Sequence, residues 1–213
     1  MLEQFIGVPC VVRDEDLVLR WCNDAYVRLG KTSKRDLMGS RMESLMSSKA
    51  AGERGGVMRR VLDSGIAARY YQFASDQRLV CDVIPLDAGS FGYRGVMITL
   101  QRTSGLGESD EAVPVLRTPC LDELAVLSPA ELRVLLHLGK GRTTAEIGQH
   151  LSRSAKTVEK QIESVHRKLG TGSRAELVRL AVERGLQAFR DEDWEQIIEG
   201  SREVRRTGPQ TTN

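Results

Sequence analysis

The amino-acid sequence predicts an α+β domain built on an antiparallel sheet, followed by an all-α domain of four helices. The first half of the chain alternates short apolar runs with turn residues, whereas the second half carries apolar residues at helical spacing. A segment rich in Gly, Ser, Pro and acidic residues separates them at residues 104–121. We therefore expect a first domain at 1–103, a linker at 104–121, a helical domain at 122–186, and an amphipathic helix with a disordered tail at 187–213.

The composition suits two small domains, each with its own core, in 213 residues. Lys and Arg total 31 against 29 acidic residues, so the net charge of +2 does not by itself indicate nucleic acid. No apolar run approaches the roughly 20 residues of a membrane helix, and the N-terminus lacks a signal pattern. We expect a cytoplasmic protein with no membrane partner. The cysteines show no metal or disulfide spacing, so we expect buried or free thiols at Cys10, Cys22, Cys81 and Cys120.

Five strands are expected in the first domain. Residues 8–21 contain an apolar run, a charged turn and a second apolar run, the pattern of a β-hairpin. Three further strand candidates, separated by turn signals such as Ser75-Asp76, span residues 66–74, 78–86 and 93–102. Helical patterns lie between the hairpin and these strands, at residues 23–30, 33–39 and 49–64. This order predicts a five-stranded antiparallel sheet with flanking helices.

Over residues 5–103 this order of elements, with Asn23, Gly30 and Gly39 as markers, resembles a PAS sensor domain. The resemblance implies a sheet and helices that enclose a small-molecule ligand or serve as a dimerisation surface. It does not identify the ligand. The Asn-Cys-Arg-Phe motif of flavin-cysteinyl photosensors is missing, and residues 1–136 contain no histidine for a histidine-ligated haem. A thiolate of Cys10, Cys22 or Cys81 could ligate haem or respond to oxidation, although plain core packing is the commoner role of cysteine.

The helical domain is marked by three segments of the capping-box type, in which a Ser or Thr is followed three residues later by Glu. They are Ser128–Glu131, Thr143–Glu146 and Ser173–Glu176. Pro129 occupies the first helical position after Ser128, where proline is favoured. These signals predict where three of the helices begin.

The central part of this domain, residues 143–169, predicts two helices joined by a tight turn. Four apolar residues of the second helix share one face, which should be buried: Val158, Ile162, Val165 and Leu169. A polar stripe lies beside that face and contains Thr157, Gln161, Ser164 and Lys168, with Glu159 and Glu163 on the opposite flank. Residues 153–168 carry five basic and two acidic side chains, which suits a helix that faces phosphates. The small Gly148 would allow close approach of the two helices.

Residues 124–186 resemble the LuxR/GerE-type helix-turn-helix domain. The residues that carry the resemblance include Glu131, Gly141, Glu146, Ile147, Leu151, Lys156, Thr157, Val158, Lys168, Leu169 and Ser173-Arg174-Ala175-Glu176. Two positions depart from the family pattern: Arg133 stands where an acidic residue is usual, and Gln161 where histidine is common. Since glutamine can pair bidentately with adenine, the second departure could alter the sequence that is recognised.

The resemblance implies a transcription regulator that binds double-stranded DNA as a homodimer on a two-fold symmetric site. We predict phosphate contacts and base contacts from Thr143, Thr144, Arg153, Ser154, Lys156, Thr157, Lys160, Gln161, Ser164 and Lys168. The resemblance also implies dimerisation through the fourth helix, for which the candidates are Leu177, Leu180 and Leu186. RNA polymerase is a further candidate partner, and the nucleoid is the expected location.

Two alternatives remain: a sigma-factor-like module that binds polymerase, and an adaptor that binds only proteins. Binding of duplex DNA that weakens with salt would separate the adaptor from the regulator. We find no catalytic constellation and predict no enzyme and no metal site. In the tail, DEDWEQIIEGSREV at residues 191–204 predicts an amphipathic helix packed on a domain or a partner, and residues 205–213 a disordered end.

Overall fold

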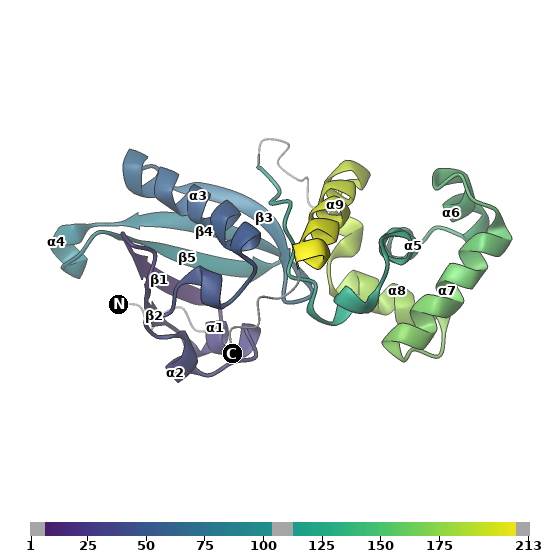
Figure 1. Cartoon of the computed structure of the whole chain (residues 1–213), viewed down its shortest axis with the longest axis horizontal. Coiled ribbons are helices and arrows are strands. Elements are labelled where there is room, and N and C mark those ends of the chain that lie inside the picture. Colours follow the sequence, from purple (N-terminus) through teal and green to yellow (C-terminus); the bar gives the residue numbers. More distant parts are fainter. Residues whose placement is uncertain (1–6, 104–112, 208–213) are drawn as a thin grey trace.

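The computed structural model describes residues 7–103 and 113–207, with side chains described up to Arg202. A sheet with its helices forms one end of the molecule, and a group of helices forms the other end (Figure 1). Among the described residues, no helix is long and apolar enough to span a membrane.

The sheet has the five antiparallel strands that the sequence predicts. They are β1 (Cys10–Asp14), β2 (Leu19–Cys22), β3 (Ala68–Ala74), β4 (Gln77–Leu86) and β5 (Gly95–Arg102). Their order across the sheet is β2-β1-β5-β4-β3, so that the N-terminal hairpin pairs with the last strand. The predicted fold class of this domain is confirmed.

Helices cover one face of the sheet: α1 (Asp24–Leu29), α2 (Lys34–Leu37), a 3₁₀ turn (Met42–Ser44) and α3 (Ser48–Ser64). A short α4 (Ala88–Phe91) connects β4 to β5. Asn23 caps α1 by accepting a hydrogen bond from the Tyr26 N–H, and its side-chain amide donates to the Val8 carbonyl oxygen at 2.7 Å. This residue thus fixes the start of α1 against the chain that enters β1.

The helical end contains α5 (Pro129–Gly139), α6 (Thr144–His150), α7 (Ala155–Leu169), α8 (Arg174–Glu183) and α9 (Asp191–Thr207), with 3₁₀ turns at Asp122–Val126 and Leu186–Ala188. The first two capping boxes form in full. The third is incomplete: Ser173 caps the Glu176 N–H, but the Glu176 carboxylate accepts its bond from the Gly172 N–H instead.

Helix α9 packs between the sheet and α5, as expected for the amphipathic tail (Figure 1). Trp194 is fully buried, and its indole N–H donates to the Leu132 carbonyl oxygen at 3.1 Å. The ring of Phe73, on β3, meets the Trp194 ring edge-on with centroids 5.4 Å apart. The helix backbone continues to Thr207, so residues 205–207 are not part of a disordered end; residues 208–213 lie outside the described residues.

The second half of the expected linker lies along the sheet edge. Tyr71 of β3 exchanges backbone hydrogen bonds with Pro114 and Leu116, each at 2.8 Å, and the Cys120 N–H donates to the Phe73 carbonyl oxygen. Residues 104–112, the first half, lie outside the described residues. The composition pointed to a loose connection, but residues 114–120 bond to the free edge of β3, which needs partners for its backbone groups.

The tip of the β3–β4 hairpin joins the two domains. Asp76 is buried, forms an ion pair with Arg184 at 2.9 Å, and accepts hydrogen bonds from the N–H groups of Glu123 and Leu124. Ser75 and Asp76 have φ values of 50° and 55°, which a two-residue hairpin turn requires but few non-glycine residues adopt. These interdomain contacts hold the tip of the turn.

Candidate functional site

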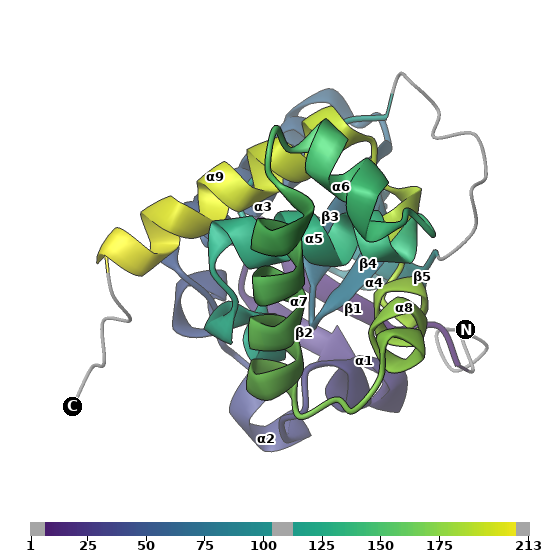
Figure 2. The same cartoon turned by 90° about the vertical axis from the view of Figure 1, so that its right-hand side faces the viewer.

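The predicted pair of helices is α6 and α7, and a close backbone approach sets their geometry. A Cβ atom on Gly148 would lie 2.7 Å from the Arg153 carbonyl oxygen, so only glycine fits where α6 meets the turn before α7. Val158 and Val165 are fully buried and Ile162 is nearly so, which confirms the predicted inner face of α7. Helices α6 and α7 lie at the end of the molecule away from the sheet, and α7 faces the viewer in Figure 2.

The outer face of α7 is open to solvent. Its exposed long or polar side chains are Lys156, Thr157, Glu159, Lys160, Glu163, Arg167 and Lys168, and Arg153 and Ser154 are exposed at its start. Among the described residues, Arg153, Lys156 and Lys160 form no ion pair. The sequence interpretation treated the two glutamates as a separate flank, whereas the structure groups them with the lysines. Since glutamate can accept a hydrogen bond from cytosine N4, Glu159 and Glu163 are base-contact candidates that sequence reasoning missed.

Lys168 and Ser164, predicted to contact DNA, turn instead toward α5. The Lys168 ammonium donates to the buried Glu131 carboxylate at 2.7 Å. Burial alone would raise the pKa of Glu131, but hydrogen bonds from Lys168, Ser128 and Ser164 outweigh it and lower that pKa to about 2. Lys168 therefore neutralises a buried carboxylate of its own domain while its side chain is still partly open to solvent, and its phosphate contact stays a prediction. The polar side chains at the C-terminal end of this stripe, Ser164 and Lys168, lie next to α5 because α5 packs against α7.

Gln161 is only half exposed, and it lies beside the other position that departs from the family pattern. Its side-chain oxygen is buried and finds no hydrogen-bond partner among the described residues. Gln161 and Arg133 line the same hollow between α5 and α7. Arg133 in turn forms a bidentate ion pair with Glu195 of α9, with N–O distances of 2.6 and 2.5 Å. Helix α9 thus supplies the carboxylate that makes a basic residue stable at this position.

The hydroxyl groups predicted to meet phosphate already have partners. Thr143 donates to the Glu146 carboxylate at 2.8 Å, and the Thr144 hydroxyl accepts from Arg174 of α8 at 3.2 Å. Ser154 caps α7 through the Thr157 N–H, and the two hydroxyls are 2.8 Å apart. Phosphate contacts from Thr143 and Thr144 would require exchange of these bonds.

Two of the three leucines predicted for dimerisation have no exposed surface for a partner. Leu177 and Leu186 are fully buried in the core of the helical domain, and Leu180 is half buried against it. The helical period identified an apolar face on α8, but that face packs on α5. The exposed side of α8 carries Ala175, Arg179 and Val182.

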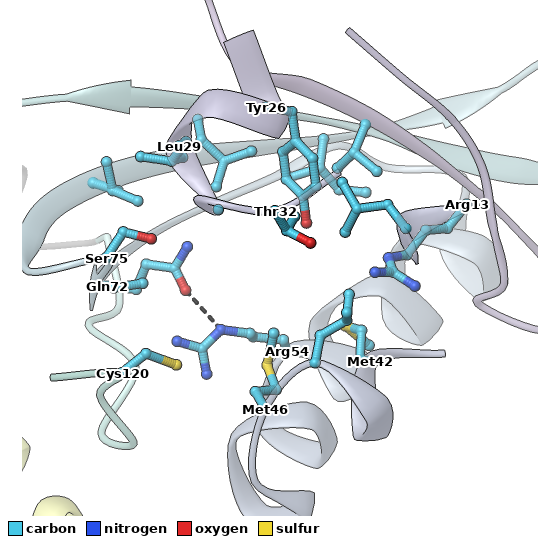
Figure 3. Close-up of a pocket in the computed structure, with 18 of the residues that line it drawn as sticks. Arg13, Tyr26, Leu29, Thr32, Met42, Met46, Arg54, Gln72, Ser75 and Cys120 are labelled. Atoms are coloured by element: carbon cyan, nitrogen blue, oxygen red, sulfur yellow. Dashed lines mark hydrogen bonds between the residues drawn. The ribbon is translucent and has the colours of Figure 1, made fainter. Parts of the chain in front are cut away.

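The sheet domain encloses a pocket of about 390 Å³ between the sheet and its helices (Figure 3). Its apolar lining includes Leu29, Leu37, Met42, Met58, Leu79 and Ile98. Two buried arginines, Arg13 and Arg54, also line it, together with Tyr26, Gln72 and Cys120. The volume lies in the lower part of the range of about 300–1,000 Å³ that small-molecule sites occupy.

The cysteines of this domain are packing residues. Cys10, Cys22 and Cys81 are buried and unbridged, and Cys120 is a half-buried free thiol. Burial raises the pKa of Cys10 to about 11 and that of Cys81 to about 12. Because the thiolate is the reactive form, these raised pKa values oppose ready oxidation of Cys10 and Cys81.

Comparison with known proteins identifies both domains. Residues 125–181 match the luxR family of bacterial regulatory proteins, and residues 3–104 match the PAS fold. The chain therefore joins a domain of the PAS fold to a LuxR-type helix-turn-helix domain. This combination is that of a DNA-binding transcription regulator.

Particular relatives cover different parts of the chain. The transcriptional activator protein ExaE of Pseudomonas putida is 47% identical over 60 residues, and the chain spans 28% of the length of that curated relative. The Vibrio cholerae VqmA dimer without its target DNA is 20% identical over 92% of this chain and 93% of that chain, with a TM-score of 0.45. A phage VqmA complex with DPO is 23% identical over 90% of this chain and 89% of that chain, with a TM-score of 0.43.

Proposed function

We propose that this LuxR-type regulator binds duplex DNA as a homodimer in the cytoplasm, with α7 in the major groove, under the control of its PAS domain. The observation that carries the proposal is the outer face of α7, where exposed basic side chains without ion pairs in the described structure lie at the end of the molecule away from the sheet. An exposed helix of this kind fits the major groove, which is about 12 Å wide.

The residues divide into two roles in this proposal. Arg153, Lys156 and Lys160 pair with phosphates and supply affinity that depends on salt. Thr157, Glu159 and Glu163 face the base edges and supply specificity. Gln161 would join them only if its half-buried side chain turned outward.

Dimerisation follows from the limited surface that one small helical module can bury on DNA. We infer that the partner copies meet on the exposed side of α8, where Val182 is 38% exposed and Ala175 leaves room for close approach. Two α7 helices related by a two-fold axis would then read two half-sites about 34–36 Å apart.

The test is selection of bound sequences from random duplexes by the full-length protein. The wild-type protein should enrich a two-fold related site. Lys156→Ala and Lys160→Ala should bind that site more weakly, while Arg35→Ala, which removes an exposed charge from α2, should bind as wild type does. Absence of any enriched sequence with folded protein would contradict the proposal and favour the protein-binding adaptor.

A further inference from the structure

Three turns of the chain line the pocket of the PAS domain and also carry ion pairs of the domain junction. They are residues 30–32 between α1 and α2, residues 74–76 at the tip of the β3–β4 hairpin, and residues 120–123 at the start of the 3₁₀ turn. The side that lines the pocket consists of Gly30, Thr32, Ala74, Ser75, Cys120 and Asp122. The residues between or beside them, Lys31, Asp76 and Glu123, belong to an ion-pair network that reaches Arg184.

Arg184, at the C-terminal end of α8, is the centre of this network. Its guanidinium pairs with the Asp76 carboxylate at 2.9 Å and with the Glu123 carboxylate at 2.8 Å. Glu123 also accepts from the Lys31 ammonium at 3.2 Å. The Asp76 side chain is 5% exposed and that of Arg184 17%, so solvent screens their pair far less than it screens the exposed pair of Lys31 and Glu123. The contact between Asp76 and Arg184 therefore contributes most to holding α8 on the hairpin tip.

The backbone of the three turns is strained. Lys31, Ser75, Asp76 and Asp122 have φ values of 49°, 50°, 55° and 39°, in the left-handed region that residues other than glycine rarely adopt. They are four of the six such residues in the part of the chain that the structure describes. A conformation of this kind persists only where the surrounding contacts hold it, and here the ion pairs supply contacts of that kind. A change in these contacts would let the turns relax.

The end of α8 packs so closely on the sheet that it would follow a movement of the hairpin tip. The Arg184 carbonyl oxygen accepts from the N–H group of Arg78, two residues beyond Asp76, at 2.9 Å. A Cβ atom on Gly185 would lie 2.6 Å from the Thr103 carbonyl oxygen, so the backbone after α8 touches the backbone after β5. A displacement of the tip would therefore be passed to α8, whose exposed side is the dimer surface in the proposed function.

We propose that Lys31, Asp76, Glu123 and Arg184 form a junction latch, through which a small molecule in the pocket controls the position of α8. The inference rests on the proposed function, because it takes α8 as the dimerisation helix. Thr32 and Ser75 face the pocket (Figure 3), so a molecule that presses on them moves the residues of the latch beside them. The contact between Asp76 and Arg184 then lengthens, α8 shifts, and the two α7 helices of the dimer change their spacing on DNA.

The first measurement uses an enlarged side chain as a fixed occupant of the pocket and follows the junction by hydrogen–deuterium exchange of the full-length protein without DNA. Thr32→Phe adds bulk beside the latch, since Thr32 is half buried and lines the pocket. It should raise the exchange rates of residues 74–78, 120–127 and 180–186 about fivefold or more. Leu45→Phe enlarges a side chain of the same pocket outside the three turns, and it should leave these rates as in the wild type.

The second measurement is a double-mutant cycle with Arg184→Gln, which removes the charge that holds Asp76 and leaves the pocket lining unchanged. Affinity for the selected duplex is measured by fluorescence anisotropy. Thr32→Phe should change this affinity about fivefold or more in the wild-type background and less than about twofold when Arg184→Gln is also present. None of these substitutions lies on α7, so the direct DNA contacts are kept.

Unchanged exchange at the junction in Thr32→Phe, or an equal change in affinity with and without Arg184→Gln, would overturn the inference. If Thr32→Phe does not fold, the smaller Thr32→Leu takes its place in both measurements. Exchange that responds as expected in a protein that binds no duplex would instead overturn the DNA-binding proposal and leave the junction latch standing.

Discussion

The two domains treat their buried charges differently. In the helical domain, Glu131 is paired with Lys168, and the partly buried Arg133 is paired with Glu195. In the PAS domain, Arg54 has only neutral partners and faces a pocket. The comparison teaches that the helical domain pairs its buried charges internally, so that the charges it leaves without ion pairs among the described residues are exposed ones such as Lys156 and Lys160. The PAS domain buries a guanidinium that no carboxylate among the described residues pairs with.

The largest effect on stability is expected from a substitution at the contact between the two domains. Phe73 belongs to β3, but its side chain packs in the core of the helical domain with Phe189 and Trp194. Phe73→Ala should lower the free energy of unfolding by about 3–5 kcal/mol, because it leaves a cavity in a core to which both domains contribute. Urea denaturation followed by circular dichroism measures the loss.

The matched control is Phe91→Ala, which truncates a half-buried phenylalanine on the otherwise exposed α4 and should have a much smaller effect. An unfolding curve for Phe73→Ala that overlays that of the wild type would show that the sheet contributes nothing to the helical core.

The pH dependence of stability tests the paired charges next. Glu131 has a folded-state pKa of about 2, below its ordinary value, so it contributes stability above about pH 4.5 that is lost as the pH falls toward 2. Burial and the nearby Arg142 lower the pKa of His137 to about 4. This neutral histidine contributes stability that is complete above about pH 6.5 and lost as the pH falls toward 4.

Each shift corresponds to a loss of about 3 kcal/mol at most. His137→Leu should therefore flatten the decline in thermal stability between pH 6.5 and 4.5 while leaving the steeper decline below pH 4.5. An unchanged profile for His137→Leu would contradict a neutral buried histidine.

A smaller change in stability should distinguish substitutions of the two lysines near the ends of α7, Lys156 and Lys168. Lys168→Ala leaves the buried Glu131 without its ammonium partner and should cost about 1–3 kcal/mol of stability. Lys156→Ala removes an exposed side chain without an ion pair in the described structure and should change stability by less than about 0.5 kcal/mol. Thermal denaturation of both variants measures the difference, and equal losses would show that the Lys168 pair is not structural.

The features that could be predicted from the sequence are those determined by residues close together in the chain. The serine and threonine caps, the hairpin at residues 8–21 and the buried face of α7 depend on neighbours a few residues apart, and the structure has them at the expected places. The family pattern likewise identified the helix-turn-helix before its geometry was known.

The features that the sequence did not predict depend on how elements distant in the sequence pack against one another. Periodicity defines an apolar or polar stripe but does not say which neighbour covers it, so the sequence did not show that Leu177 packs on α5 or that Lys168 pairs with Glu131. The burial of Arg54 does not follow from the sequence, because a lone arginine in a polar helix is ordinarily at the surface. Only the fold brings it under the sheet, beside Gln72 and residues 114–120.

The most direct test of the account is the salt dependence of DNA binding for the wild-type protein, Lys160→Ala and Lys168→Ala on one selected duplex. A lysine that contacts phosphate contributes about 0.9 to the slope of log K against log salt concentration. The account predicts that Lys160→Ala lowers the slope by about this amount and that Lys168→Ala, measured where it is folded, keeps the wild-type slope. A reduced slope for Lys168→Ala with an unchanged slope for Lys160→Ala would contradict it.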